Sequence, residues 1–262
     1  MSLLSVQWFG VNAVRFTHKG FVVLLDPYLT RDPDAGSDPG YLKRHLPKAN
    51  VIVVSHSHWD HLADVPAIAG YTGATVVGSQ TTTNICRAFG VPEAQLVTEG
   101  ADGVYHEGEF KVRLLPSLHA LSDDGKVAYP GSYALPPPLP LRREDYLEGG
   151  TFAPLLSFGA VSVLDIGSAN CIDEAIAGQH CDLLLVSIAR MERTPRFVER
   201  VLGCVTTPRI MAVHFDDFTR SLEDGLWPQP YVDVEGFRRQ AQRLAPSAQV
   251  ILPDLLETLT IG

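Results

Sequence analysis

The sequence predicts an α/β fold in which two β-sheets pack together and helices cover them from outside. The first fifty residues are patterned as strands, and the remainder alternates helices with strands in two halves. Two packed sheets with outer helices satisfy that order. With 262 residues, 45% of them hydrophobic, the chain can bury a large core. We find no 20–50-residue repeat of the kind that solenoids show.

The N-terminal region is predicted to form a short run of strands joined by turns. The predicted strands are Ser5 to Phe9, Ala13 to Thr17 and Phe21 to Leu25. His18-Lys19-Gly20 is predicted to be the hairpin turn between the second and third strands. Asp26-Pro27 ends the third strand, and the Asp-, Pro- and Gly-rich stretch 31–40 is predicted to be a loop.

From residue 51 onward, strands and helices alternate. Val51 to Val54 is entirely apolar, as expected for a strand covered on both faces. The later predicted strands are Thr75 to Val77, Phe110 to Leu115, Phe152 to Phe158, Val161 to Ile166, Leu183 to Ser187, Ile210 to Val213 and Gln249 to Leu252. The predicted helices are Val65 to Ala69, Thr82 to Phe89, Asp173 to Ala177, Arg196 to Leu202 and Val234 to Leu244.

Composition indicates which classes of binding partner and which cell compartment are compatible with this chain. A net charge of −9 makes nucleic acid an unfavourable partner and argues against docking on anionic membranes. No apolar run approaches the roughly 20 residues that a membrane span needs. The N-terminus MSLLSVQWFG lacks the features of a signal peptide. The four cysteines show no CxxC spacing, so we expect free thiols in a cytoplasmic protein: Cys86, Cys171, Cys181 and Cys204.

The segment Ser55-His56-Ser57-His58-Trp59-Asp60-His61 follows the apolar strand directly. In an extended segment His56, His58 and Asp60 would project to one side, while His61 would turn elsewhere. These groups could hold one metal ion or two neighbouring ones, which hydrolytic sites space about 3.5–4 Å apart. The carboxyl end of a buried strand is also where α/β sheets place their sites.

Two further histidines lie just beyond predicted strands, His119 and His214, and are candidates for the same site. The remaining four are predicted to be solvated: His18, His45, His106 and His180. Asp26 and Asp165 interrupt apolar runs. Each could be a buried partner of a ligand histidine, whereas Asp26 could equally cap the turn before Pro27.

The segment SHSHWDH resembles the HxHxDH motif of the metallo-β-lactamase superfamily. LLDPYLT resembles the early strand and turn of the branch related to ascorbate phosphate lactonases and N-acyl-phosphatidylethanolamine phospholipases. LPSLHA, VLDIGSAN and AVHFDDF follow in that family's order, so the resemblance covers nearly the whole chain. It implies a single domain over residues 1–262, built as a four-layer αββα sandwich of two mixed sheets flanked by helices.

The resemblance also implies the ligands. His56, His58 and His119 would form a first metal site, and Asp60, His61 and His214 a second. The usual bridging aspartate, however, is replaced by Ser168, and Asp165 lies at an odd offset that points it to the other face. Either the second site is weakened or another carboxylate, such as Asp216 or Asp165, compensates. We expect one tightly held ion and a second that is weak or absent.

The implied activity is metal-dependent hydrolysis of a small molecule such as an ester, lactone, amide or phosphodiester. The metal would activate water. Asp60 would orient or deprotonate that water, and His214, if not a ligand, would bond the leaving group. Zinc suits the imidazoles, and manganese and iron fit too. The alternatives are a mononuclear iron dioxygenase and a non-catalytic metal-binding descendant; His58 argues against the diiron electron-transfer branch, which typically has glutamate there.

A Pro-rich insertion at about 120–150 does not fit the alternating pattern. A connection of that length is typically functional or disordered, and its tyrosines and leucines favour order. We expect it to border the metal cleft as a lid, while a surface strap and an oligomer contact are alternatives. Arg142 and Arg143 within it could bind an anion or simply be solvated.

Overall fold

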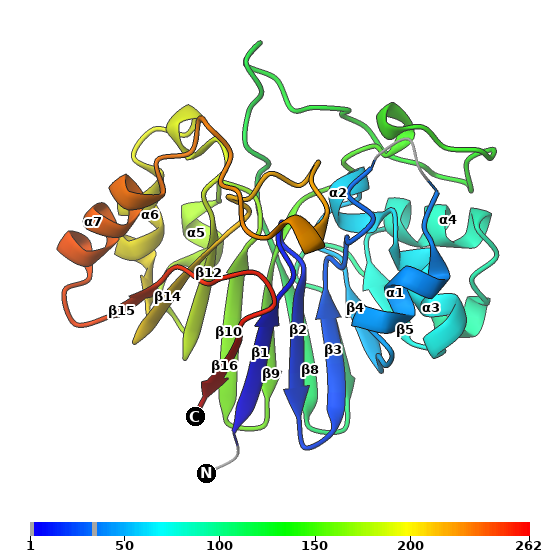
Figure 1. Cartoon of the computed structure of the whole chain (residues 1–262), viewed down its shortest axis with the longest axis horizontal. Helices are drawn as coiled ribbons and strands as arrows, with labels where there is room; N and C mark the ends of the chain where they lie inside the picture. Colours follow the sequence, from blue (N-terminus) through cyan, green and yellow to red (C-terminus); the bar gives the residue numbers. More distant parts are fainter. Residues whose placement is uncertain (1–2, 33–35) are drawn as a thin grey trace.

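Two seven-stranded sheets pack face to face in the computed structural model, which describes residues 3–32 and 36–262. The first sheet has the strand order β16-β1-β2-β3-β4-β5-β6, and the second has the order β15-β14-β12-β10-β9-β8-β7. Helices flank the paired sheets on both sides (Figure 1). This arrangement confirms the predicted sandwich of two mixed sheets with helices outside.

Each sheet is antiparallel in one half and parallel in the other. In the first sheet β16, β1, β2 and β3 run antiparallel, and β3 to β6 run parallel. Its strands are β1 (Leu4–Trp8), β2 (Val14–His18), β3 (Phe21–Leu25), β4 (Val51–Val53), β5 (Thr75–Gly78), β6 (Leu96–Thr98) and β16 (Thr258–Ile261).

The second sheet repeats this scheme, with β7 to β10 antiparallel and β10, β12, β14 and β15 parallel. Its strands are β7 (Val104–Glu107), β8 (Phe110–Pro116), β9 (Phe152–Phe158), β10 (Val161–Ile166), β12 (Leu183–Ser187), β14 (Arg209–Val213) and β15 (Gln249–Ile251). A small parallel pair lies apart from it, β11 (Gln179–His180) with β13 (Val205–Thr206).

The helices divide between the two outer faces (Figure 1). Those on the side of the first sheet are α1 (Pro39–His45), α3 (Val65–Thr72) and α4 (Gln80–Ala88). Those on the side of the second sheet are α5 (Asp173–Ile176), α6 (Phe197–Cys204) and α7 (Val234–Leu244). The short α2 (Trp59–Leu62) lies instead at the end of β4, where the histidines gather. No helix in the described residues is long and apolar enough to cross a membrane.

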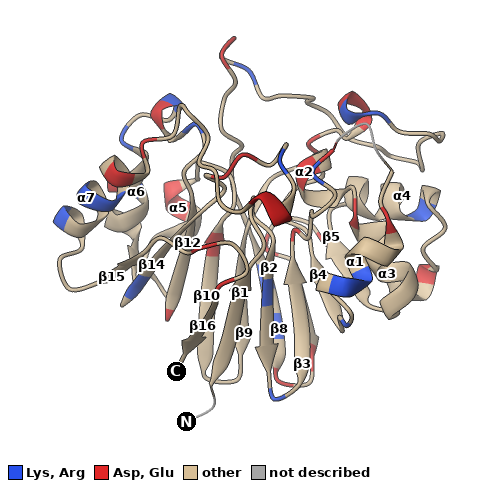
Figure 2. Cartoon of the chain, in the orientation of Figure 1, with Lys and Arg blue, Asp and Glu red and all other residues tan. Residues whose placement is uncertain are grey.

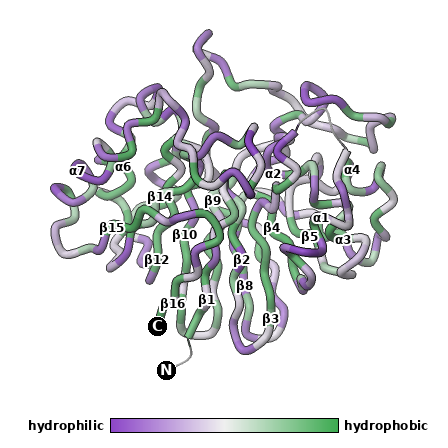
Figure 3. The backbone as a smooth tube through the Cα atoms, in the orientation of Figure 1, coloured by the Kyte–Doolittle hydropathy of each residue, from purple (hydrophilic) through white to green (hydrophobic). Residues whose placement is uncertain are grey.

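Strand β4 shows how the layers are built. Val51 and Val53 belong to the core between the sheets, whereas Ile52 and Val54 pack into the core under the helices. All four are fully buried, so the strand is covered on both faces as its apolar run predicts. In Figure 3 the central strands are the most hydrophobic part of the chain, and the outer helix α7 is largely hydrophilic.

The turn between β2 and β3 corrects one prediction. His18 pairs with Phe21 as the last residue of β2, so only Lys19 and Gly20 form the turn, at φ angles of 48° and 81°. Two-residue turns with positive φ match the twist of hairpin strands. His18 is therefore 3% exposed rather than solvated, and its Nε2 lies 3.3 Å from a carboxylate oxygen of Glu109.

Residues 120–150 form a long segment, here called the strap, that runs over the strand ends and α4 (Figure 1). It holds one short 3-10 helix, η2 (Arg143–Asp145). Backbone bonds fasten it: the Ser57 amide donates to the Glu148 carbonyl at 2.8 Å, and Gly149 donates to Gly131 at 2.9 Å. The strap is thus tied to the histidine segment.

Candidate metal centre

The ends of three strands bring six metal-competent side chains to one edge of the sandwich. His56 and His58 follow β4, and the first turn of α2 carries Asp60 and His61. His119 follows β8, and His214 follows β14 directly. The six form two groups, His56 with His58 and His119, and Asp60 with His61 and His214, and within each group one ligand atom per residue lies within 4.8 Å of the others. These are the sets that the family resemblance implies.

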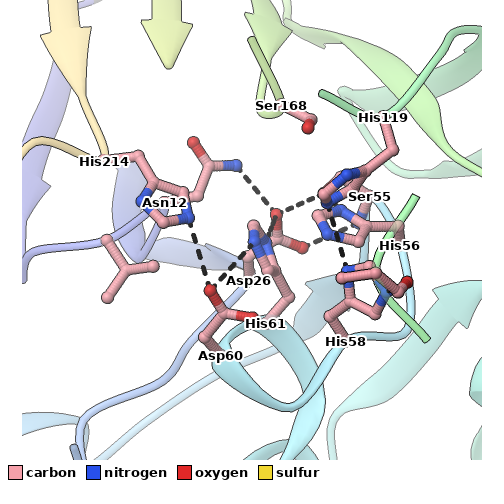
Figure 4. Close-up of polar contacts among 12 residues, drawn as sticks. Asn12, Asp26, Ser55, His56, His58, Asp60, His61, His119, Ser168 and His214 are labelled. Atoms are coloured by element: carbon pink, nitrogen blue, oxygen red, sulfur yellow. Dashed lines mark hydrogen bonds and ion pairs between the residues drawn. The ribbon is translucent and has the colours of Figure 1, made fainter. Parts of the chain in front are cut away.

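The first group consists of three imidazoles that face one another. Ring centroids lie 4.8 Å apart for His56 and His58, 4.8 Å for His56 and His119, and 4.6 Å for His58 and His119. Figure 4 shows the three rings converging from two strand ends. His56 is 1% exposed and His58 4% exposed, so bulk water does not solvate these nitrogens.

Hydrogen bonds on the far side of each ring set which nitrogen keeps its lone pair. His58 Nε2 donates to the Ala128 carbonyl at 2.8 Å, and His119 Nδ1 donates to the Ala120 carbonyl at 2.7 Å. Because a carbonyl only accepts, the inward His58 Nδ1 and His119 Nε2 both carry lone pairs. These two atoms lie 3.1 Å apart. Two facing lone pairs repel unless a cation lies between them.

His56 completes this arrangement. The Ser55 hydroxyl donates to Asp26, so it can accept from His56 Nδ1, which lies 3.1 Å away. The other nitrogen, His56 Nε2, is buried and has no hydrogen-bond partner among the residues that the structure describes. A buried polar atom without a partner is costly. Three inward lone pairs therefore fit a metal ion bound by neutral imidazoles.

The second group differs because a carboxylate lies among its imidazoles. His214 Nε2 is 3.4 Å from Asp60 Oδ2, and His61 Nε2 is 3.9 Å from the same oxygen. The His61 ring also lies 3.9 Å from the His56 ring, between centroids, so the two groups adjoin. The Asp60 carboxylate therefore already has polar partners in His214 and His61, unlike the unpartnered nitrogen of the first group.

The local backbone differs from the predicted extended segment. Strand geometry ends before Asp60, because α2 begins at Trp59 with His58 as its N-cap residue. Asp60 therefore groups with His61 and His214, while the His61 ring also lies next to the His56 ring. The prediction that Asp60 projects with the first two histidines, and that His61 turns elsewhere, is therefore wrong, whereas the grouping implied by family resemblance matches the geometry.

Asp26 supports both groups from beneath. Its carboxylate accepts from His61 Nδ1 at 2.8 Å, from the Ser55 amide at 2.7 Å and from Asn12 Nδ2 at 2.8 Å. The structure thus favours the imidazole-partner role of Asp26 over a turn cap alone. Asp165 bonds no imidazole and instead accepts from the same Asn12 Nδ2 at 2.9 Å. No sequence pattern marks Asn12 as their shared donor.

His214 is held in a strained conformation at the end of β14. Its φ is 58°, a region that non-glycine residues seldom adopt, at a cost on the order of 1–3 kcal/mol. Its amide donates to the Val11 carbonyl at 2.7 Å, and the Val11 amide donates to Asp216 at 2.7 Å. Asp216 also forms a buried ion pair with Arg31 at 2.7 Å. Asp216 therefore supports the His214 loop and is not among the grouped ligand atoms.

Ser168, for which the family resemblance implies the bridging position, borders the cleft. Its hydroxyl accepts from the Ala120 amide at 3.0 Å, and Asn170 donates to the His119 carbonyl at 3.2 Å. Both contacts fix the segment that carries His119. Figure 4 shows Ser168 near His119 at the edge of the grouped side chains. No described carboxylate other than Asp60 belongs to either group.

Burial and neighbouring charges set the protonation of these groups. Burial lowers the pKa of His56 well below its ordinary value and that of His119 to about 3. Burial opposes the imidazolium of His61, but the Asp26 and Asp60 carboxylates outweigh it and raise that pKa. Burial likewise opposes the Asp60 carboxylate, yet His61 and His214 hold its pKa below the ordinary value. Neutral imidazoles are what metal coordination requires.

A cleft of about 350 Å³ opens above the two groups. The strap lines it with Ala128, Tyr129 and Arg143, as expected for a segment that borders the site. Trp59 and Phe218 contribute aromatic walls. The cleft is within the range of small-molecule sites.

The model of the metallo-β-lactamase superfamily matches residues 6–155, more than half of the chain and the part that carries the HxHxDH motif. The chain belongs to the metallo-β-lactamase superfamily. The match ends before His214, which is placed by geometry and by its position after β14.

Within the superfamily, the chain is similar to curated proteins named UPF0173 metal-dependent hydrolases. It is 33% identical over 130 residues to the one from Carboxydothermus hydrogenoformans, covering 49% of this chain and 54% of that protein. It is 40% identical over 104 residues to the one from Cupriavidus taiwanensis, covering 38% and 35%. The chain thus spans about half the length, or less, of the curated relatives it matches.

Solved structures share the fold at low identity. A metallo hydrolase from Ignicoccus hospitalis has a TM-score of 0.66 and 15% identity, with 99% of both chains covered. A metallo-β-lactamase-fold protein from Bacillus subtilis has a TM-score of 0.63 and 13% identity, covering 99% of this chain and 100% of that one. A diiron β-hydroxylase from Streptomyces venezuelae has a TM-score of 0.63 and 15% identity, covering 98% and 54%. These likenesses show the fold alone.

Proposed function

We propose that the protein is a metal-dependent hydrolase of a small-molecule substrate. The observation that carries the proposal is the pair of inward lone pairs on His58 Nδ1 and His119 Nε2, 3.1 Å apart, beside the unpartnered His56 Nε2. An arrangement of this kind needs a cation, and it lies at the floor of an open cleft. The relatives named metal-dependent hydrolases are consistent with this function.

The first ion would be held by His56, His58 and His119, and a second, weaker one by Asp60, His61 and His214. Zinc is the ion that three neutral imidazoles fit best, and manganese or iron would fit the same donors. When bound, such an ion lowers the pKa of water and polarises the substrate. The weak second site follows from Ser168, a neutral hydroxyl where the resemblance implies a bridging carboxylate.

Asp60 would accept a proton from the attacking water. Its side chain is 13% exposed, so it reaches the cleft, and its lowered pKa keeps it ionised. His214 is 11% exposed and lies 3.4 Å from Asp60, where it can hold the carboxylate in place and bond a leaving group. Asp26 fixes the tautomer of His61 by accepting from its Nδ1.

Metal analysis combined with an activity panel tests the proposal. Protein purified without added metal is analysed by plasma mass spectrometry, stripped with chelator, reloaded with zinc, manganese or iron, and assayed on esters, lactones, amides and phosphodiesters. We expect metal-dependent hydrolysis and about one tightly bound ion. Stoichiometric iron without hydrolysis would favour a dioxygenase, and metal binding without any turnover would favour a non-catalytic protein.

We also propose a cytoplasmic location. All four cysteines are free, and Cys86, Cys171 and Cys181 are buried. Free thiols of this kind are typical of reducing compartments. Fractionation of cells that express a tagged protein tests this location. Finding the tagged protein in the fraction of an oxidising compartment would contradict the proposal.

A further inference from the structure

One arginine of the strap lies against the proposed metal-binding segment. The guanidinium carbon of Arg143, in η2, lies 4.7 Å from the centre of the Trp59 ring. Trp59 stands between His58 and Asp60 in the sequence and is 4% exposed. Both residues line the cleft above the histidines. A positive charge is therefore placed at the rim of the proposed reaction site.

No ion pair neutralises this charge among residues 3–32 and 36–262. The other arginine that lines the cleft, Arg190, lies 3.0 Å from Asp123 and 5.6 Å from the centre of the Tyr231 ring. Within the described part of the chain, Arg143 makes the cation–π contact with Trp59 and no ion pair. A guanidinium stacked on an aromatic face keeps its N–H groups at the edge, where they can bind a carboxylate or phosphate in the plane.

The position of Arg143 is set before any ligand arrives. Next to it, the Arg142 amide donates to Asp145 Oδ2 at 2.8 Å, and the Tyr133 hydroxyl donates to the Asp145 carbonyl at 3.0 Å. The Tyr133 amide in turn donates to Thr81 of α4 at 2.9 Å. A recognition group on a fastened segment loses little freedom when it binds.

The negative overall charge makes a cation at the rim of the cleft favourable for an anionic substrate, in addition to any metal ion below it. The chain carries a net charge of −9, and both signs of charge are spread over the loops above the strand ends (Figure 2). An anion approaching such a protein is repelled on average and gains attraction only from a local positive group. Arg143 supplies that group beside Tyr129 and Phe218, which offer apolar surface in the same cleft.

We propose that the substrate of this cleft carries an oxyanion, a carboxylate or phosphate, which Arg143 binds while the scissile bond lies over the histidine groups. This specificity rests on the proposed hydrolase function. Arg142 provides a matched control, because it is the neighbouring arginine, is exposed and does not line the cleft.

The test compares paired substrates in metal-loaded wild type, Arg143→Gln and Arg142→Gln. Each pair consists of a neutral ester and the same ester with a remote carboxylate or phosphate. For the anionic member we expect Arg143→Gln to lower kcat/KM about 10- to 100-fold, mainly through KM, because a charge-assisted bond is lost. The neutral member should change less than about threefold, and Arg142→Gln should change neither.

Binding is measured separately, so that the two proposals fail independently. Calorimetric titration uses phenylphosphonate and benzoate, which the enzyme cannot hydrolyse. Arg143→Gln should weaken their binding about tenfold or more, with Arg142→Gln unchanged. If no ester is hydrolysed but this difference remains, the hydrolase proposal fails and anion recognition stands. Equal losses on neutral and anionic esters, or equal binding by the two variants, would overturn the recognition proposal.

Discussion

The two groups of metal-competent side chains share one edge of the sandwich and differ in chemistry. The first has only imidazoles, and each ring is oriented by a neutral group: the Ser55 hydroxyl or the Ala128 or Ala120 carbonyl. The second has the Asp60 carboxylate among its rings and the Asp26 carboxylate behind His61. In the first group, imidazole nitrogens face one another with their lone pairs. In the second group, imidazoles lie beside negatively charged carboxylates.

This difference predicts unequal metal affinity. A cation that enters the first group removes the repulsion between the lone pairs of His58 Nδ1 and His119 Nε2, and it gives His56 Nε2 a partner. It does so without breaking a hydrogen bond that orients these rings. A cation entering the second group competes with the contact between Asp60 and His214 at 3.4 Å. Ser168 adds no charge to help it. The first site should therefore fill first.

Removing a ligand of the first group should have the largest effect. His58→Ala should lower kcat/KM more than about a hundredfold, beyond what loss of an outer-shell partner causes, and release at least one ion. Circular dichroism should show the fold intact. His106→Ala, at an exposed position on β7, is the matched control and should retain activity and metal. Wild-type turnover in His58→Ala would mean that the site lies elsewhere.

Removing the charge of Asp26, which accepts a hydrogen bond from His61 of the second group, should have the next largest effect on metal binding and activity. Asp26→Asn keeps the size of the side chain but removes the charge that faces His61, so metal affinity or activity should fall about 10- to 100-fold. Metal titration and steady-state kinetics measure this, with the exposed Asp102→Asn as control. Stability should also fall by about 1–3 kcal/mol, because Asn12 and Ser55 lose a charged acceptor. Unchanged metal binding would reduce Asp26 to a purely structural role.

A carboxylate at residue 168, where the family resemblance implies a bridging group, should narrow the difference in metal affinity between the two groups. Ser168→Asp should raise affinity for the second ion about tenfold, as expected for a charged ligand in place of a neutral one. Titration after chelation would show two steps in wild type and closer steps in the variant, with Ser168→Ala leaving the second step weak. Two equally tight ions in the wild type would contradict the predicted asymmetry.

Shortening the strap should have the smallest effect on metal. Replacing residues 135–138, where Leu135 is 77% exposed, by two glycines should shift relative kcat/KM between substrates a few-fold. Metal content should stay constant, because none of the six grouped side chains belongs to this segment. Kinetics that are equal on every substrate would leave the strap a structural element only.

The sequence predicted which metal-competent side chains gather at the strand ends, because these residues follow apolar strands. The apolar strand, the motif after it and the order of His119 and His214 identified all six grouped residues. It was wrong on Asp60 and His61, because helix α2 starts inside the motif and replaces the strand alternation. His18 was misassigned for a similar reason, since a two-residue turn leaves it on the strand.

Contacts between distant segments could not be predicted. Asn12 donates to Asp26 and also to Asp165, which lies 153 residues after Asn12 in the sequence. Arg31 pairs with Asp216, which lies 185 residues after it. Neither pair has a sequence pattern of its own. Likewise, two adjacent arginines look alike in the sequence, and only the packing of η2 against Trp59 separates Arg143 from Arg142.

Because the grouped side chains come from both sheets, a bound metal would also affect how the two sheets hold together. Each group takes two side chains from the segment after β4 in the first sheet and one from the second sheet, His119 or His214. An ion in the first group would therefore act as a cross-link between the layers and close a loop of 61 residues between His58 and His119. Loops of that size restrict the unfolded chain by about 3–5 kcal/mol in the entropic description of cross-links. Bound metal would then hold the two sheets together at this edge. Amide exchange at the carboxyl ends of β4 and β8 should therefore slow when metal binds.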